Sequence, residues 1–145
     1  MMLHQPVFTV LLVEDEAADA DLVQMAFEEG RLLAHLHHVI DGVEALEFLR
    51  REGDRFADAP RPDLILLDLN MPRMNGREFL ESIKQDPDLR QIPVVVLTTS
   101  DVERDVVASY DLGASGYVVK PVDLDQFMKA IQGIKRYWVT VVKLP

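Results

Sequence analysis

The chain has 145 residues, of which 48% are hydrophobic and 28% are charged, with no cysteine and a net charge of −10. This length suits one domain with a buried core, and the composition excludes a disordered or disulfide-stabilised chain. The acidity argues against direct binding to nucleic acid, because that binding depends on basic side chains at the phosphates. The chain has no apolar run long enough to span a membrane and no signal-peptide pattern, so we expect a cytoplasmic protein.

Apolar and β-branched runs alternate with segments that repeat apolar side chains at helical spacing. In chain order, we predict a strand at 7–13, a helix at 17–29, a strand at 36–40, a helix from Asp41 to near Gly53, a strand at 62–67, a helix at 77–84, a strand at 92–97, a helix at 102–112, a strand at 115–119 and a helix at 124–135. The long connection GDRFADAPRP predicts a mobile surface loop.

Capping residues support several of these boundaries. Asp41 and Asp101 stand where the side chain of an N-cap would accept a backbone hydrogen bond. Gly30 and Gly113 follow two of the helices as C-terminal caps.

Five strands that alternate with helices over short connections indicate a parallel sheet covered on both faces. We therefore predict a flavodoxin-like α/β fold, a (βα)5 three-layer sandwich with strand order 2-1-3-4-5.

Polar side chains follow four of the predicted strands directly. Asp68 comes after the run LILL, Glu14 and Asp15 come after the first strand, and Thr98 and Lys120 come after the fourth and fifth. In the predicted order these four strands are neighbours, and ligands of open α/β sheets bind at the carboxyl ends of the strands. We therefore expect the carboxylates, the hydroxyl and the ammonium to converge on one crevice.

Three carboxylates in one crevice repel one another unless a cation neutralises them. Hard oxygen ligands in a partly open site suit Mg²⁺, which usually binds one or two carboxylates together with a phosphate. Asp68 could then act as a nucleophile and form an aspartyl phosphate, while Thr98 and Lys120 hold the phosphoryl oxygens.

The motifs VEDE, LLDLNMPRMNG, VVVLTTS and YVVKP resemble the receiver domain of two-component response regulators over residues 7 to about 135. The resemblance implies that Asp68 accepts phosphate from a phosphohistidine of a sensor kinase and that Mg²⁺ binds to Glu14, Asp15 and Asp68. It also implies the roles of three further residues: Asn70 as a metal ligand through its backbone carbonyl, Tyr117 as an aromatic switch beside Thr98, and Pro121 as the site of a cis peptide bond that directs Lys120.

The segments LLVEDEAADADLVQMAF and GIKRYWVTVVKLP narrow the resemblance to the single-domain regulators paired with bacterial and cyanobacterial phytochrome kinases. We expect a receiver domain at 7–137 and a C-terminal extension at 138–145. The apolar ending either folds back on its own domain or reaches a second copy in a homodimer, and we favour the second interpretation. A histidine phosphotransfer protein or another target would be a further partner.

Other classes of function fit the sequence less well. A haloacid dehalogenase-type phosphatase or phosphotransferase also forms an aspartyl phosphate with Mg²⁺, but its nucleophile follows the first strand and has a second Asp two residues later. Here Asp68 follows the third strand and Asn70 occupies the second place. A flavodoxin is excluded because VEDEAAD would repel a flavin phosphate. We expect a signalling switch without a separate substrate, and a solvated or structural role for His35, His37 and His38.

Overall fold

A computed structural model of the chain describes residues 8–29, 34–69, 74–108, 112–121, 125, 126 and 129. Its strands are β1 (Phe8–Val13), β2 (Ala34–Val39), β3 (Leu64–Asp68), β4 (Val94–Thr98) and β5 (Gly116–Val119). Its helices are α1 (Ala17–Glu29), α2 (Gly42–Arg50), α3 (Gly76–Gln85) and α4 (Asp101–Ala108), with a 3₁₀ turn at Asp54–Phe56. The predicted alternation of strands and helices is confirmed over this part of the chain.

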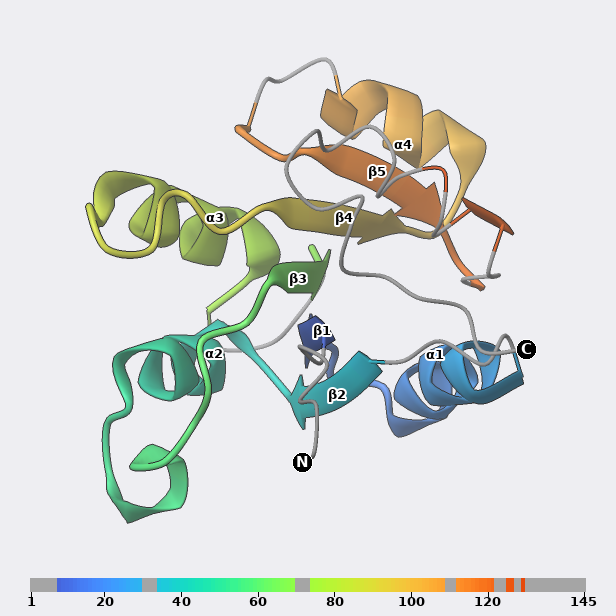
Figure 1. The fold of residues 1–145 in the computed structure, drawn as a ribbon. Coiled ribbons are helices and arrows are strands. Elements are labelled where there is room, and N and C mark those ends of the chain that lie inside the picture. Colours follow the sequence, from blue (N-terminus) through green and yellow to red (C-terminus); the bar gives the residue numbers. More distant parts are fainter. Residues whose placement is uncertain are drawn as a thin grey trace, which may run out of the picture.

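The five strands form one parallel sheet in the order β2-β1-β3-β4-β5, which is the predicted order. Figure 1 shows α1 on one side of this sheet and α2 and α3 on the other, with α4 beside β5. The crossover connections between parallel strands place helices on both faces, and the carboxyl ends of the central strands lie together at one end of the sheet. The α/β flavodoxin-like fold class is therefore confirmed.

Each face of the sheet has its own hydrophobic core. Alternate residues of β1, such as Leu11 and Val13, pack with α2, α3 and α4, while Val10 and Leu12 pack with α1. Nearly every side chain of β3 and β4 is fully buried. Strands buried on both faces explain the continuous apolar runs in the sequence, and this rigid centre positions the polar residues at the strand ends.

Some element boundaries differ from the prediction. β2 begins at Ala34, α2 ends at Arg50, and the next residue, Arg51, adopts a left-handed conformation as the helix cap. Asp41 caps α2 as predicted, because its Oδ1 accepts a hydrogen bond from the Glu44 amide. At α4, however, the Ser100 hydroxyl accepts from the Glu103 amide and Asp101 is the first helical residue. The predicted cap at Asp101 is therefore wrong by one residue.

The connection between α2 and β3 is more closely packed than predicted. Phe56 and Ala59 belong to the core on the α2 side of the sheet, and the ring of Phe56 packs edge-on against Phe48. A mobile surface loop was predicted here, and the surface position is wrong at these two residues, because their apolar side chains are buried in the core. Gly30, the last predicted helix at 124–135 and the extension at 138–145 are not covered fully by the described residues, so these predictions are untested.

Space is tight where β3 meets α3. A Cβ atom at Gly76 would lie 2.7 Å from the carbonyl oxygen of Asp68 and 2.5 Å from the Cα of Leu69. The amide of Gly76 also donates a hydrogen bond to the Leu69 carbonyl. The start of α3 is therefore pressed against the end of β3, and this position requires glycine for its lack of a side chain. Within the described residues, no helix is long and apolar enough to cross a bilayer.

Candidate metal and phosphoacceptor site

The ends of β1 and β3 bring three carboxylates together. Val13 lies opposite Leu67 in the sheet register, so the residues that follow, Glu14 and Asp68, leave adjacent strands at the same height. Carboxylate oxygens of Glu14, Asp15 and Asp68 all lie within 4.8 Å of one another. The predicted convergence of these three residues is observed.

Lys120 supplies the positive charge beside this group. Its Nζ lies 2.5 Å from Oε1 of Glu14, 3.0 Å from Oδ2 of Asp19 and 3.3 Å from Oδ2 of Asp68. The side chain of Lys120 is only 14% exposed. The cis peptide bond between Lys120 and Pro121 is present as predicted. One ammonium thus contacts three carboxylates, while the negative charge of Asp15 adds to the same crevice.

Burial and neighbouring charges shift the pKa values of Glu14 and Lys120. Glu14 is fully buried, and this desolvation, together with the neighbouring Asp68, raises the pKa of its carboxyl group to about 8 despite the contact with Lys120. The carboxylates in turn raise the pKa of Lys120 above its ordinary value, although burial acts in the opposite direction. The ammonium therefore stays charged, but one cation does not compensate the whole acidic group.

The donor set fits a divalent cation. The ammonium of Lys120 lies 2.5 Å from the buried Oε1 of Glu14, but Asp19 and Asp68 share the same ammonium. Buried carboxylates are costly unless their charge is compensated, and a bound cation would add the compensation that a shared ammonium does not supply. The oxygens of Glu14, Asp15 and Asp68 are the hard ligands that a cation such as Mg²⁺ prefers.

The predicted switch residues lie on the neighbouring strands β4 and β5. Thr98 is buried at the end of β4, where its strand neighbours both β3 and β5. Its hydroxyl lies 3.4 Å from the carbonyl oxygens of Ser100 and Val118, which are long distances for a hydrogen bond. Tyr117 is half-buried and packs against the core on the α2 side of the sheet. Thr98 therefore lies beside the carboxylates with its hydroxyl directed to the main chain.

Two contacts of this site were not predicted from the sequence. Asp19 in the first turn of α1 pairs with Lys120, and Nε2 of His38 lies 2.6 Å from the carbonyl oxygen of Glu14. His37 lies against the ring of Phe48, so both histidines have the structural role that we expected. Asn70 is outside the described residues, and its predicted part in metal binding is untested.

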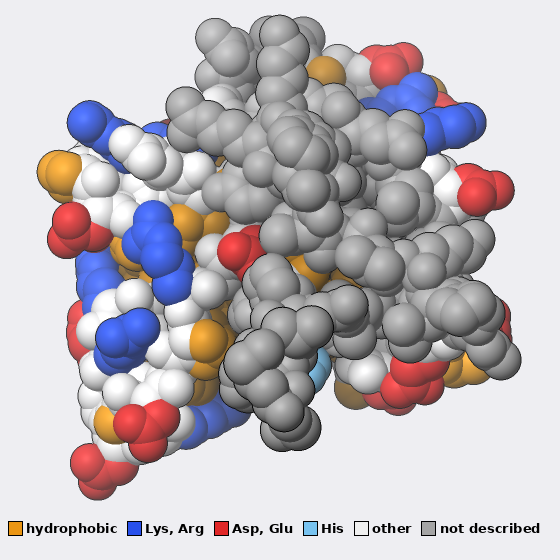
Figure 2. All heavy atoms as spheres, viewed as in Figure 1, with side chains coloured by type: hydrophobic (Ala, Val, Ile, Leu, Met, Phe, Trp, Pro, Cys, Tyr) orange, Lys and Arg blue, Asp and Glu red, His pale blue; other side chains and the backbone are white. Residues whose placement is uncertain are grey.

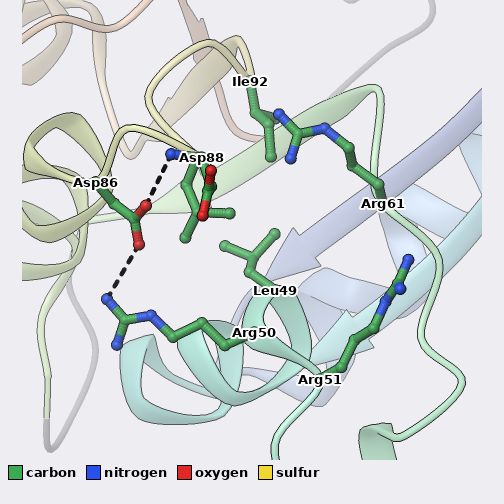
Figure 3. A pocket seen from close by; sticks show the side chains of 8 residues that line it. Leu49, Arg50, Arg51, Arg61, Asp86, Asp88 and Ile92 are labelled. Carbon is green, nitrogen blue, oxygen red and sulfur yellow. Dashed lines mark hydrogen bonds and ion pairs between the residues drawn. The ribbon is translucent and has the colours of Figure 1, made fainter.

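A separate pocket lies at the amino ends of β3 and β4, far along the strands from Asp68. It has a volume of about 390 Å³ and an apolar floor that includes Leu49, Leu89 and Ile92. Figure 3 shows the side chains of Arg50, Arg51 and Arg61 around this pocket, with Arg50 paired to Asp86. Figure 2 shows that Lys and Arg side chains gather over the part of the molecule where α2 and α3 lie. None of the predicted site residues lines this pocket.

Comparison with known proteins agrees with the geometry. Residues 10–132 match the response regulator receiver domain. This match covers most of the chain, so the chain belongs to the response regulator receiver domain family. The sheet order and the cluster of three carboxylates agree with this assignment. The predicted family and its function as a response regulator of two-component signalling are thus confirmed, and the dehalogenase-type alternative is not favoured.

Response regulators, among them phytochrome response regulators, are similar to this chain over most of its length. Response regulator Rcp1 of Synechocystis sp. (strain ATCC 27184 / PCC 6803 / Kazusa) is 47% identical over 140 residues, which are 97% of this chain and 95% of Rcp1. The Mn²⁺-bound structure of Rcp1 matches with a TM-score of 0.71 over 95% of this chain and 99% of that chain. The bacteriophytochrome response regulator RtBRR is 45% identical, with a TM-score of 0.83 over 92% of this chain and 81% of its own.

A third relative was crystallised in its phosphorylated form. The cyanobacterial phytochrome response regulator RcpA is 45% identical and matches with a TM-score of 0.73 over 93% of this chain and 96% of that chain. The narrower resemblance to phytochrome-linked regulators, which the sequence motifs indicated, is therefore confirmed as a similarity of sequence and structure.

Proposed function

We propose that this chain is a phosphorylation-dependent switch in which Asp68 is the phosphoacceptor and Mg²⁺ is the bound cation. The observation that carries this proposal is the approach of Glu14, Asp15 and Asp68 to within 4.8 Å of one another beside the ammonium of Lys120. Mg²⁺ would be held by these three carboxylates and by the carbonyl of Asn70, and it would offset negative charge on the phosphoryl oxygens.

The residues of the chain then divide the work. A carboxylate oxygen of Asp68 attacks the phosphorus of a phosphohistidine, the P–N bond breaks, and the imidazole leaves with the bonding electrons. Lys120 holds one phosphoryl oxygen through its ammonium. Thr98 turns its hydroxyl from the main chain toward another oxygen, and Tyr117 follows into the space that Thr98 leaves. The altered surface near α4 and β5 signals by binding a partner or by passing the phosphate to a histidine phosphotransfer protein.

The test uses beryllofluoride, which mimics an aspartyl phosphate, with Mg²⁺ in a titration followed by NMR. We expect shifts of the amide signals of Thr98 and Tyr117, and we expect Asp68→Asn to abolish them. Asp58→Asn, which removes an exposed carboxylate on the loop before β3, is the matched control and should respond as the unaltered chain does. A response that persists in Asp68→Asn would identify another acceptor and contradict the proposal.

The donor proposed for Asp68 is a sensor histidine kinase of the phytochrome type. The similarity to RtBRR and RcpA, which are phytochrome response regulators, supports this choice. Radiolabelled phosphate should pass faster from an autophosphorylated phytochrome-type kinase than from a sensor kinase of another class when the two are compared at equal concentration. Equal rates from both kinases would contradict the pairing.

The tail is proposed to support a homodimer. Residues 138–145 are strongly apolar, and an apolar segment of this kind is stable in water only when another surface covers it. Truncation after Arg136 should halve the mass measured by light scattering. An unchanged mass would show that the extension does not join two copies.

A further inference from the structure

Asp19 contacts the ammonium of Lys120 from a helix, whereas the other carboxylates around this ammonium follow strands. Its Oδ2 lies 3.0 Å from Nζ of Lys120, which is closer than the 3.3 Å between Nζ and Asp68. The two residues are 101 positions apart in the sequence. The first turn of α1 therefore places a carboxylate on the lysine that the proposed function assigns to the phosphoryl group.

Asp19 is outside the set of carboxylates that could hold a cation. Among the residues that the structure describes, that set consists of Glu14, Asp15 and Asp68. When a divalent cation binds these three residues, it leaves the charge of Asp19 uncompensated, and Lys120 is the partner of Asp19 in the described part of the chain. The competition for the ammonium then lies between Asp19 and the incoming anion.

The ammonium has little freedom on the α1 side. A lysine ammonium has three N–H donors, and here they face the carboxylates of Glu14, Asp19 and Asp68. The cavity between Lys120, Asp19, Leu22 and Pro121 has a volume of only about 10 Å³, which is about the space of one water molecule. Lys120 is therefore held in place, and an anion at Asp68 has to draw one donor away from a carboxylate.

Asp19 is the carboxylate that can release Lys120 at the lowest cost. Its side chain is 37% exposed, whereas that of Glu14 is fully buried. A half-exposed carboxylate can exchange an ammonium for water, while a buried one cannot.

We propose that Asp19 is a positioning residue, which holds Lys120 in the resting protein and lowers the affinity of the site for phosphoryl-type anions. This inference rests on the proposed role of Asp68. Asp19 restrains the anion in two ways, because it occupies a donor of Lys120 and because its negative charge repels the anion at short range. Removal of its charge therefore favours occupation of the site.

The experiment measures the binding of beryllofluoride and the rate of phosphorylation by acetyl phosphate, both with the full chain in the presence of Mg²⁺. We expect Asp19→Asn to lower the half-saturating concentration of both anions by about two- to five-fold, which is the range for a partly exposed charge pair. The maximal rate with acetyl phosphate should change less than the half-saturating concentration. The NMR signal of the Lys120 ammonium should shift in the anion-free protein, which a merely structural role of Asp19 would not predict.

Two further variants isolate the charge of Asp19. Asp21→Asn changes the net charge equally, but it alters an exposed residue two positions along α1, and it should leave the half-saturating concentrations unchanged. Asp19→Glu keeps the negative charge and should remain close to the unaltered chain. Asp19→Ser replaces Asp19→Asn if urea unfolding shows that the Asn variant is not folded.

The outcomes separate this inference from the proposed function. No Asp68-dependent response in the unaltered chain would overturn the proposed function. A normal response in the unaltered chain, with equal half-saturating concentrations for Asp19→Asn and Asp21→Asn, would overturn the role of Asp19. Weaker anion binding in Asp19→Asn would also overturn it, because it would show that Asp19 helps Lys120 to hold the anion.

Discussion

The two halves of the site differ in how far they are formed in the resting structure. At the ends of β1 and β3, Glu14, Asp15 and Asp68 already lie close enough to share a cation. At the ends of β4 and β5, the hydroxyl of Thr98 is directed to main-chain carbonyls, and Tyr117 packs against the core. The comparison teaches that the three carboxylates are already assembled in this structure, while the proposed switch through Thr98 and Tyr117 requires both side chains to change position.

Lys120→Met tests how strongly the formed half depends on the ammonium of Lys120. The change removes the cation beside buried Glu14 and Asp68, so we expect the free energy of unfolding to fall by about 3–5 kcal/mol in EDTA at neutral pH. Urea unfolding measures this loss. Saturating Mg²⁺ should restore a large part of it, because the metal would then compensate the same carboxylates.

A loss of stability that Mg²⁺ does not reduce would contradict the comparison. It would show that Lys120 contributes through packing of its aliphatic chain and not through compensation of the acidic group.

Glu14→Gln tests the cost of the buried carboxylate. Because burial raises the pKa of Glu14 from 4.5 to about 8, the folded protein binds this proton more tightly than the unfolded chain does. The free energy of unfolding of the metal-free protein should therefore fall as the pH rises through this range. At about pH 9 in EDTA we expect Glu14→Gln to be more stable than the unaltered chain by about 2 kcal/mol.

The same substitution should weaken Mg²⁺ binding by at least about ten-fold, which isothermal titration calorimetry measures. Opposite signs for stability and metal affinity are the signature of a site arranged for a cation. Equal stability of both proteins across the pH range would show that the Glu14 carboxylate is not strained.

Thr98→Val tests the half of the site that has to move. The hydroxyl makes contacts of 3.4 Å to the main chain, so its loss should change the free energy of unfolding by less than about 1 kcal/mol. The half-saturating concentration of beryllofluoride should rise by about ten-fold or more, because a hydrogen bond to a charged oxygen is lost. Mg²⁺ affinity should stay unchanged, and a clear decrease would show that Thr98 already belongs to the cation site.

The sequence was sufficient for the sheet order and for the convergence of Glu14, Asp15, Asp68 and Lys120. Buried parallel strands appear as continuous apolar runs, and the residue that ends each run has to lie at the same edge of the sheet. The family motifs then assigned the chemistry of the site. The similarity of residues 10–132 to the receiver domain confirms the family.

Other features depend on distances that a linear pattern does not contain. The contact between Asp19 and Lys120 depends on which face of α1 is turned toward the strand ends. The direction of the Thr98 hydroxyl depends on which side-chain rotamer is adopted. Phe56 and Ala59 lie in a segment with many turn-forming residues, so local composition predicted an exposed loop although tertiary packing buries both. At α4, Ser100 and Asp101 are both good capping residues, and sequence alone did not distinguish them.

Gly76 joins the acceptor to the framework of the protein. Its backbone lies against the carbonyl of Asp68 without room for one methyl group, so the start of α3 is in direct contact with the end of β3. A docked protein that displaces α3 would therefore also displace Asp68. Replacement of Gly76 by alanine would push the end of β3, and Asp68 with it, away from α3. Engineered versions of this regulator therefore have to keep this glycine while they vary the surface of α3.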